Sequence, residues 1–389
     1  MSASGASSSV VVNGKVSGWQ VRRSLSEGTS RVIGLSYPAM KRVAILLFAL
    51  TLTGSAMPVV PLLTAPDVPM YQAFVESLIA SAREEVLAAL SDVRLYSEGG
   101  ATAGLLTALA AAAGRGVRVR LLAERREERP HPRQRHALDY LAEQGVEVQW
   151  DTPEVTLHAK FLVVDRRWVV VGSTHWTMSA LTRSVQMDLA VESAELGAAF
   201  GQFFDLLWEG QLKAIPQLPP QPWPRPAVVP LLDFPQGNLH AQVIPDMIRQ
   251  ATESVQVIIY RLGYYPGYGD SPSNRIVEAL CLAAARGVEV QVLIESGEDF
   301  ADLAHGNRVS AAYLIVCGVA VRFDAPGTTL HAKSLIVDGR DVLVTSANWS
   351  HFSLVRNVEA GLAFFGVPEL ALLLRRLINE MWVQARPLR

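Results

Sequence analysis

Hydrophobic and polar positions along residues 64–215 predict helices and strands in turn. Apolar residues three or four positions apart predict a long helix from Tyr71 to Leu90. A later Ala/Leu-rich run predicts a second helix, which ends near Gly114, and strict alternation after it predicts a strand. After the first helix, the predicted elements are a strand over 93–96, a helix over 103–113, a strand over 117–122, a helix over 136–144 and a strand over 146–150.

The second half of the chain repeats this order of elements. Its predicted helices span 245–253, 276–286 and 309–316, and its predicted strands span 255–260, 288–294 and 319–323. The similar phrases over 113–119 and 284–290 mark the same helix-to-strand turn in each half. Strands that alternate with helices predict two α/β repeats, each a mixed β-sheet flanked by helices.

Three segments differ from the repeats in composition. Residues 1–39 are rich in Ser and Gly and are predicted to be disordered or untranslated. Residues 40–63 contain Met40, two basic residues, a short apolar core and small residues near Ala56. This order predicts a signal peptide or an uncleaved membrane anchor, and therefore a periplasmic, envelope or secreted protein. Residues 216–230 hold seven prolines and predict a stiff linker between repeats over 64–215 and 231–389.

The balance of charge bears on the substrate, and the two cysteines bear on disulfide bonding. The 389 residues include 35 Lys and Arg against 37 Asp and Glu, and the pI is about 6.5. A protein that mainly grips nucleic acid more often carries a basic excess, so this balance counts against DNA as the sole substrate. Cys281 and Cys317 both lie in apolar runs, which favours two buried free thiols over a disulfide.

The most informative feature is a motif that occurs once in each half. Residues 157–165 read Leu-His-Ala-Lys-Phe-Leu-Val-Val-Asp, and residues 330–338 read Leu-His-Ala-Lys-Ser-Leu-Ile-Val-Asp. The motif histidines, His158 and His331, are 173 residues apart, and each copy continues to a Ser and then a Trp at matching positions. Because side chains alternate along a strand, each His is expected to share a face with the Lys two residues later.

Two histidines and two lysines that converge from duplicated halves suit a phosphodiester. The ammonium groups of Lys160 and Lys333 can neutralise a phosphate, while one imidazole attacks phosphorus and the other protonates the leaving oxygen. Buried structural histidines are the usual alternative, but the repeated spacing disfavours them. A metal site is disfavoured because the ammonium groups repel cations and no Cys or close carboxylate cluster is available. We therefore expect neither metal nor cofactor.

The doubled His-x-Lys-x4-Asp motif resembles that of the phospholipase D superfamily over about residues 66–385. The resemblance implies two repeats packed about a pseudo-twofold axis around one shared site. It implies His158 as nucleophile and His331 as general acid and then base, and it leaves Asp165 and Asp338 as organising members of the motif. Lys160 and Lys333 would hold phosphate oxygens, helped by Asn348 and by Ser173 or Ser346. Asn357-Val358-Glu359 matches the family's Asn-x-Glu, whose acid orients a motif His.

The first repeat departs from this pattern. His175 stands where the second repeat has Asn348, and it is either a further phosphate donor or a tolerated substitute. Ser184 and Gln186 replace the Asn and Glu, and Asp188, two residues farther along the same strand face, could supply the missing acid. In the second repeat, Thr345 replaces the usual Gly before the Ser.

Two loops differ between the halves. Residues 125–135 hold five arginines and could form a basic lip over an anionic substrate or a solvated loop. Residues 260–269 are rich in Tyr and Gly and could form a plain surface loop, stack on bases or dip into a lipid interface.

The resemblance implies a phosphodiesterase of the phospholipase D type. A phospholipid is the preferred substrate, either hydrolysed to phosphatidic acid or transferred to another alcohol, with a membrane surface as partner. The alternatives are an exported nuclease of the same superfamily and a non-catalytic phosphate- or lipid-binding module. Two motifs in one chain remove the need for a dimer, so a monomer is expected.

Overall fold

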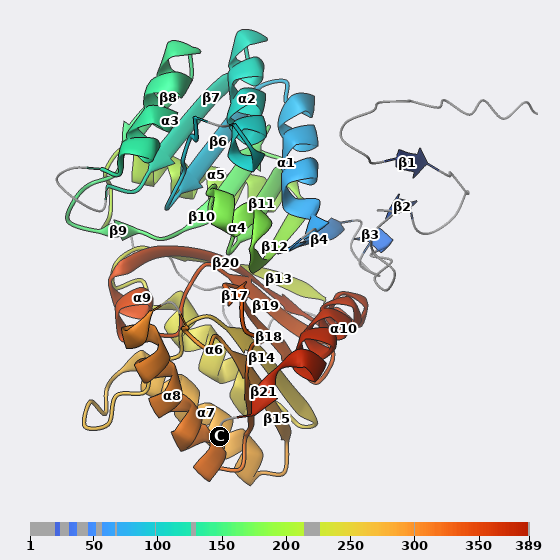
Figure 1. The fold of residues 1–389 in the computed structure, drawn as a ribbon, viewed down its shortest axis with the longest axis vertical. Helices are drawn as coiled ribbons and strands as arrows, with labels where there is room; N and C mark the ends of the chain where they lie inside the picture. Colours follow the sequence, from blue (N-terminus) through green and yellow to red (C-terminus); the bar gives the residue numbers. More distant parts are fainter. Residues whose placement is uncertain are drawn as a thin grey trace, which may run out of the picture.

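The computed structural model describes residues 57–387 apart from 67, 98, 126–129, 214–225 and 299. Of residues 1–56 it describes only the backbone of three strands, which are β1 (Gln20–Arg23), β2 (Arg31–Ser36) and β3 (Leu46–Thr51). Two α/β repeats account for the rest of the described chain (Figure 1).

The first repeat is built on one mixed sheet. From one edge to the other, its strands follow the order β4-β12-β11-β10-β6-β7-β8, and β1–β3 continue the sheet beyond β4. The strands are β4 (Pro58–Ala65), β5 (Val68–Pro69), β6 (Glu85–Leu90), β7 (Arg118–Ala123), β8 (Glu147–Trp150), β9 (Thr156–Leu157), β10 (Lys160–Val164), β11 (Trp168–Gly172) and β12 (Ser184–Glu192). The helices are α1 (Met70–Ser81), α2 (Ala101–Gly114), α3 (Pro132–Glu143), α4 (Met178–Thr182) and α5 (Ala194–Trp208).

The second repeat has the same design, with the strand order β13-β20-β19-β18-β14-β15-β16-β21. Its strands are β13 (Ala227–Asp233), β14 (Ser254–Ile259), β15 (Glu289–Ile294), β16 (Ala320–Phe323), β17 (Thr329–Leu330), β18 (Lys333–Val337), β19 (Asp341–Thr345), β20 (Asn357–Phe365) and β21 (Arg386–Pro387). Its helices are α6 (Leu239–Arg249), α7 (Pro272–Ala285), α8 (Ala301–Val316), α9 (His351–Val355) and α10 (Pro368–Gln384). The predicted pair of α/β repeats, each a mixed sheet flanked by helices, is confirmed.

Each motif begins on the other repeat's sheet. The short strand β9 pairs in parallel with β20, and β17 pairs in parallel with β12. The pairing runs up to the histidines, because His158 N donates to Val358 O at 3.0 Å and His331 N donates to Val185 O at 2.8 Å. Each chain segment then returns to its own sheet as β10 or β18. This reciprocal exchange relates the repeats by a pseudo-twofold axis and fixes both histidines at their junction.

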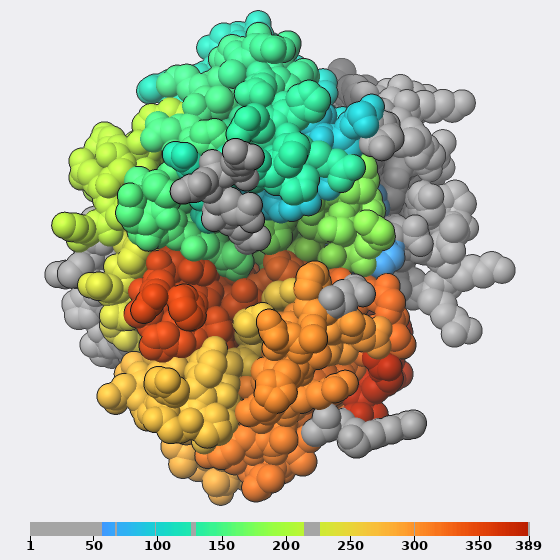
Figure 2. All heavy atoms as spheres, turned by 60° about the vertical axis from the view of Figure 1, so that its left-hand side comes forward, coloured from blue at the N-terminus to red at the C-terminus, as the bar shows by residue number. Residues whose placement is uncertain are grey.

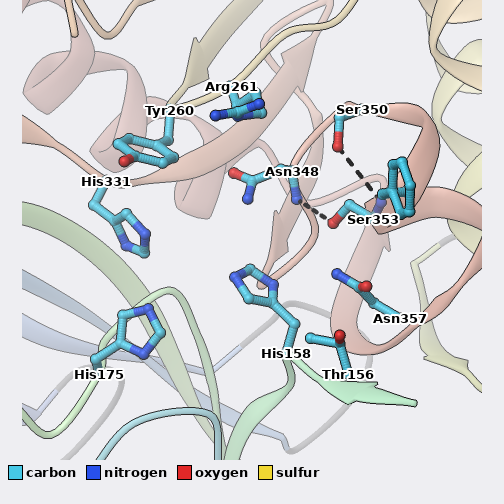
Figure 3. Close-up of a pocket in the computed structure, with 11 residues that line it drawn as sticks. Thr156, His158, His175, Tyr260, Arg261, His331, Asn348, Ser350, Ser353 and Asn357 are labelled. Carbon is cyan, nitrogen blue, oxygen red and sulfur yellow. Dashed lines mark hydrogen bonds between the residues drawn. The ribbon is translucent and has the colours of Figure 1, made fainter. Parts of the chain in front are cut away.

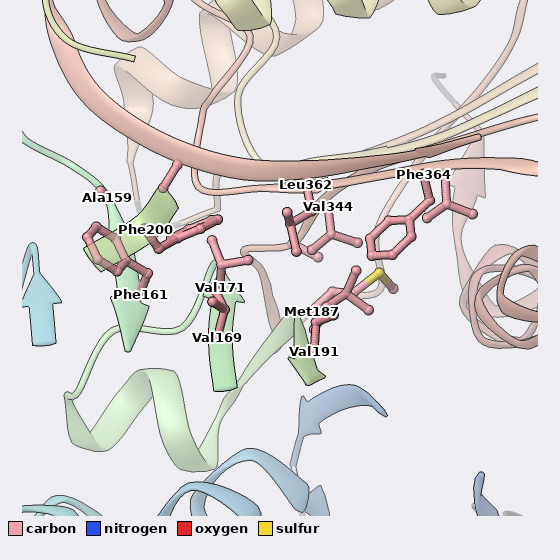
Figure 4. Close-up of a cluster of buried hydrophobic side chains, with 14 of the residues drawn as sticks. Ala159, Phe161, Val169, Val171, Met187, Val191, Phe200, Val344, Leu362 and Phe364 are labelled. Atoms are coloured by element: carbon pink, nitrogen blue, oxygen red, sulfur yellow. The ribbon is translucent and has the colours of Figure 1, made fainter. Parts of the chain in front are cut away.

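An apolar core joins the repeats. Alternate residues of β10, β11 and β12 face alternate residues of β19 and β20, as expected when strands present one face to a partner (Figure 4). This core includes Phe161, Val171, Met187, Val344 and Phe364, all fully or almost fully buried. The contact between repeats therefore excludes water and resembles the interior of one domain. Figure 2 shows the repeats, green above and yellow to red below, meeting across one face of the molecule.

The predicted helix from Tyr71 to Leu90 is wrong in its second half. Helix α1 ends at Ser81, and β6 then lies between β10 and β7 in the sheet. Strand β6 is buried on both faces, so its sequence after Glu85 is continuously apolar and does not alternate. The predicted strand over 93–96 is also wrong, because only Val93 forms an isolated bridge, to Trp176.

Two predicted boundaries shift because flanking residues join the sheets. Strand β4 lies partly within the predicted leader 40–63 and pairs with β12, where Leu62 faces Asp188. Strand β13 takes in the last residues of the predicted linker, and Pro230 is tolerated there because β13 is an edge strand. Strands β1 and β2 fall within the segment predicted to be disordered. The proposed start at Met40 and cleavage near Ala56 lie outside the described residues, among which no helix is both long and apolar enough to span a membrane.

The prediction of two free thiols is wrong. Cys281 and Cys317 form a disulfide, with Cα atoms 5.2 Å apart, that links α7 to the end of α8. Because α7 and α8 pack side by side, residues 36 positions apart in the chain become neighbours (Figure 1). Both cysteines are only partly buried, so their apolar sequence neighbours were a poor guide to their environment.

Candidate active site

A pocket of about 390 Å³ opens at the junction of the repeats (Figure 3). The first repeat contributes three lining residues, Thr156, His158 and His175. The second repeat contributes eight, which are Tyr260, Arg261, His331, Asn348, Ser350, Phe352, Ser353 and Asn357. Both motif histidines therefore line one cavity, as a shared site requires.

His158 is oriented by an acid from the opposite repeat. Its Nδ1 lies 2.9 Å from each carboxylate oxygen of Glu359. An ionised carboxylate only accepts hydrogen bonds, so Nδ1 carries the proton and Nε2 keeps its lone pair. Burial lowers the pKa of His158 to about 4, although the Glu359 charge opposes this shift. The imidazole is consequently neutral, and nucleophilic at Nε2, at ordinary pH.

Glu359 is fully buried and fully hydrogen bonded. Ser346 Oγ donates to Oε2 at 2.6 Å, Asn357 Nδ2 donates to Oε1 at 3.0 Å, and Ser353 Oγ donates to Oε1 as well. Burial alone would raise the pKa of this carboxyl, but His158 and these donors hold it well below its usual range. Glu359 is thus a fixed negative charge behind His158.

His331 has a neutral partner instead. Gln186 Oε1 accepts from His331 Nδ1 at 2.9 Å and from Ser173 Oγ at 2.8 Å. Burial first, and then the Lys333 and Lys160 ammonium groups, lower the pKa of His331 well below its usual value. Each motif histidine is thus held through Nδ1 by a residue of the opposite repeat: His158 by Glu359, and His331 by Gln186.

The expectation that Asp188 replaces the missing acid is wrong. Asp188 accepts hydrogen bonds from the backbone N and the hydroxyl of Thr174, while Gln186 itself reaches His331. Burial raises the pKa of Asp188 to about 6. Its side chain fits only because its register partner is Gly172, where an added Cβ would lie 2.5 Å from Asp188.

A glycine on the facing strand also makes room for the Thr345 side chain. In the second repeat the glycine is Gly361, opposite Thr345, and a Cβ there would come within 2.8 Å of the Thr345 side chain. Thr345 Oγ1 uses this space to meet His240 Nε2 at 2.7 Å, and His240 Nδ1 lies 2.7 Å from Asp233. The departure from the family's Gly is therefore compensated across the strand pair.

The two lysines lie under the histidines. Lys160 Nζ donates to His158 O, and Lys333 Nζ donates to His331 O at 2.6 Å and lies 3.1 Å from His331 Nε2. Burial, and then the neighbouring Lys160, hold the pKa of Lys333 well below its usual range. Neither lysine is among the residues that line the pocket, but each lies directly behind a histidine that does. The positive charges of the two amines make protonation of the nearby histidines less favourable, and a bound anion would offset this effect.

Two buried polar atoms of the pocket have no partner among the described residues, His175 Nδ1 and Asn348 Oδ1. The His175 ring lies close to both motif histidines, with centroids 5.1 Å from His331 and 6.1 Å from His158. Buried polar groups normally find partners, so these two side chains fit a ligand held between the histidines. His175 and Asn348 occupy matching positions in the two repeats and both face the cavity (Figure 3).

Four predicted site residues lie away from the cavity. The Ser173 and Ser346 hydroxyls, expected at the phosphate, instead hold Gln186 and Glu359 in place. Asp165 accepts from the backbone N atoms of residues 83–85, and Asp338 accepts from those of residues 252–254. The two aspartates therefore fix the start of the neighbouring strands β6 and β14.

Sequence reasoning missed a pair of acids behind each histidine. Glu295 Oε2 accepts from Leu330 N at 2.6 Å, one residue before His331, and the Asp324 carboxyl lies beside it. Burial, and then the Asp324 charge, raise the pKa of Glu295 to about 7. In the first repeat, Glu124 and Asp151 both accept from Leu157 N in the same way. These acids come from the ends of four strands, so no local sequence pattern reveals them.

The two variable loops have different places. Tyr260 and Arg261, at the start of the Tyr/Gly loop, line the pocket, and the Tyr260 ring lies 4.6 Å from that of His331. Tyr264 stacks on Tyr313, whereas Tyr268 is exposed. Residues 126–129 of the basic loop lie outside the described residues. Within the part of the chain that the structure describes, no group of three or more His, Cys, Asp and Glu side chains is arranged to hold a metal ion.

Comparison with known proteins gives these features a family context. The family model described as "Cardiolipin synthase, PLD-like domain" matches the chain twice, over residues 75–208 and 244–382. The enzymes named cardiolipin synthase A of Pectobacterium atrosepticum and Pectobacterium carotovorum are each 26% identical to the chain over 335 residues. The match covers 75% of this chain and 66% of each relative, so the chain spans just under two thirds of their length.

Solved structures share the fold. The phosphatidylserine synthase of Haemophilus influenzae matches with a TM-score of 0.66 and 15% identity, over 82% of this chain and 86% of its own. A polyphosphate kinase of Porphyromonas gingivalis matches with a TM-score of 0.56 and 14% identity, over 84% of this chain and 50% of its own. At these identities the likeness concerns the fold alone.

Proposed function

The chain belongs to the phospholipase D superfamily and carries two cardiolipin synthase-type domains, and on this premise we propose that it is a phosphatidyltransferase acting on phospholipids. The observation that carries the proposal is the pocket in which His158 and His331 face one cavity, each oriented by a residue of the opposite repeat. The relatives named cardiolipin synthase A support a phospholipid as substrate.

In the first step, His158 Nε2 attacks the phosphorus of the donor lipid. A P–N bond forms, the P–O bond to the leaving alcohol breaks, and His331 gives a proton to the departing oxygen. Glu359 makes His158 the better nucleophile, because its negative charge stabilises the positive charge that develops on the imidazole. Gln186 leaves His331 more acidic, which suits a proton donor.

In the second step, His331 takes the proton of an acceptor alcohol, whose oxygen attacks phosphorus and breaks the P–N bond. His158 returns to its starting form. Water in place of the alcohol would give phosphatidic acid. The lysines, His175 and Asn348 surround the position of the phosphoryl oxygens, and the anionic phosphate lowers the cost of the proton on His331.

The proposal is tested with purified protein in EDTA on phosphatidylglycerol vesicles and, separately, on single-stranded DNA. Lipid turnover that is lost in both His158→Ala and His331→Ala supports a phosphatidyltransferase. Cleavage of DNA instead, lost in the same variants, would reassign the protein as a nuclease. No turnover of either substrate would leave a phosphate- or lipid-binding module.

A further inference from the structure

Each repeat contributes one motif histidine to the pocket, but the two repeats contribute unequally to the rest of its wall. Eight of its eleven lining residues come from the second repeat, so the cavity extends to that side (Figure 3). Among these residues, Arg261 alone carries a permanent positive charge.

The backbone of Arg261 is held rigidly. Its O accepts from Trp349 N at 3.0 Å, and the next two residues are fixed by Leu262 N donating to Asn307 Oδ1 at 3.0 Å and Gly263 N donating to Trp349 O at 2.7 Å. Its guanidinium is half-buried and makes no hydrogen bond or ion pair with any described residue. A guanidinium that extends from a fixed backbone into a cleft, without a carboxylate partner among the described residues, is suited to an external anion, and phosphate fits its planar fork.

The position in the first repeat that matches Arg261 holds an acidic residue that is already paired. The bridges of Val93 to Trp176 and of Leu262 to Trp349 align Arg261 with Asp92. Asp92 already has a partner, because Arg94 Nη2 lies 2.7 Å from its Oδ2. At this matched position of the described residues, the second repeat therefore presents a charge that is available to a ligand, and the first repeat does not.

Arg261 lies on the alcohol side of the reaction, an assignment that rests on the function proposed above. If His158 bonds to phosphorus, the leaving alcohol departs on the opposite side, next to His331, and the acceptor alcohol enters by the same route. Arg261 follows Tyr260, whose ring packs at 4.6 Å from His331. We propose that Arg261, with the neighbouring Ser350 hydroxyl, forms an acceptor subsite that selects an alcohol carrying an anionic phosphate.

The test compares acceptors in Arg261→Gln, with phosphatidylglycerol vesicles as donor. Labelled glycerol is the neutral acceptor and glycerol 3-phosphate is the phosphorylated one. We expect kcat/KM for glycerol 3-phosphate to fall at least tenfold and glycerol exchange to change less than twofold. Arg376→Gln on the remote helix α10 removes the same charge from an exposed position and should change neither. Equal losses for both acceptors, or no loss for either, would overturn the proposal.

A binding measurement separates this proposal from the proposed function. Calorimetry on the full chain does not require turnover, so it decides the question even if no lipid is transferred. We expect glycerol 3-phosphate to bind Arg261→Gln at least tenfold more weakly than wild type, or with one equivalent fewer. Unchanged binding would overturn the subsite. A loss of inorganic phosphate binding without any loss for glycerol 3-phosphate would also contradict it, because the site would then hold a bare anion and not an acceptor.

Discussion

Glu359 of the second repeat holds His158 of the first, with Nδ1 at 2.9 Å from both carboxylate oxygens. The contact exists because β9 pairs with β20, which brings Val358, the neighbour of Glu359, against the motif backbone. Neither repeat contains a complete nucleophile by itself. The two repeats therefore complete one site together and are joined by an apolar core.

Removing the charge of Glu359 tests this dyad. Glu359→Gln keeps the size of the side chain but leaves no negative charge to stabilise the developing imidazolium. We expect kcat to fall by roughly 10²- to 10⁴-fold, the usual range for lost acid–base assistance, with a smaller effect on KM. Steady-state kinetics measures both, with exposed Glu369→Gln as the matched control. A change in kcat of less than threefold would argue against the dyad.

Giving His331 a carboxylate is the complementary change. In Gln186→Glu, the new charge lies at hydrogen-bond distance from Nδ1 and should raise the pKa of His331 by about one unit or more. His331 then keeps its proton to higher pH, so the alkaline limb of kcat should move upward. A pH–rate profile of the variant beside wild type measures the shift. An unmoved alkaline limb would mean that His331 is not the group that donates the proton.

The pH dependence of wild type follows from His158. Its pKa is lowered to about 4, so it stays neutral and nucleophilic well below the ordinary histidine value of about 6.5. We expect kcat/KM to hold down to about pH 5 and to fall near pH 4. In the unfolded chain His158 binds its proton near pH 6.5, so stability also decreases as pH falls through this window. Circular dichroism at each pH separates the two effects, and an acid limb at pH 6.5 in folded protein would contradict the assignment.

The acids behind His331 predict a second pH effect, on stability. The pKa of Glu295 is raised to about 7, so the folded state holds a proton that the unfolded state releases near pH 4.5, and stability decreases as pH rises through this range. Asp324 Oδ2 is buried without a donor, while Oδ1 accepts from Ser296 N at 2.7 Å. We expect the proton held by the folded state to be shared between the Glu295 and Asp324 carboxyls. In Asp324→Asn, the side-chain amide can donate a hydrogen bond to Glu295 in place of this shared proton.

Thermal unfolding at pH 5 and pH 8 tests this arrangement. Asp324→Asn should match wild type at pH 5 and be more stable at pH 8, by about 1 kcal/mol for a shift of one pKa unit. The other charges nearby are Glu298 and its partner Arg386, 2.8 Å away, which the substitution leaves in place. A variant that is less stable than wild type at pH 8 would show that the pair carries no shared proton.

Local patterns were sufficient for the reactive groups. His158, Lys160, His331 and Lys333 follow from a nine-residue motif, and Glu359 follows from a short one. Their spacing is set by the strand itself, so the sequence carries it directly. The order of most predicted helices and strands is equally local. The exceptions are residues 93–96, which form only an isolated bridge, and β6, whose burial on both faces removes the alternation that identifies a strand.

The remaining features depend on contacts between distant segments. Gln186 reaches His331 across the junction, and the choice between it and Asp188 depends on which strand position faces the other repeat. The pairs Glu295–Asp324 and Cys281–Cys317 likewise meet only through the sheet order and the packing of α7 on α8. Arg261 becomes part of the site because the bridge to Trp349 brings its loop to the cavity.

The central claim is that His158 forms the covalent intermediate and His331 handles the proton. It is tested most directly with a phosphatidyl donor whose leaving group is p-nitrophenol, which needs no protonation to depart. Mass spectrometry of peptides from quenched His331→Ala should find the phosphatidyl group on the peptide that contains His158, because the second step lacks its base. The same treatment of His158→Ala should leave every peptide unmodified. An adduct on His331 in the His158→Ala protein, with none on His158 in the other variant, would contradict the account.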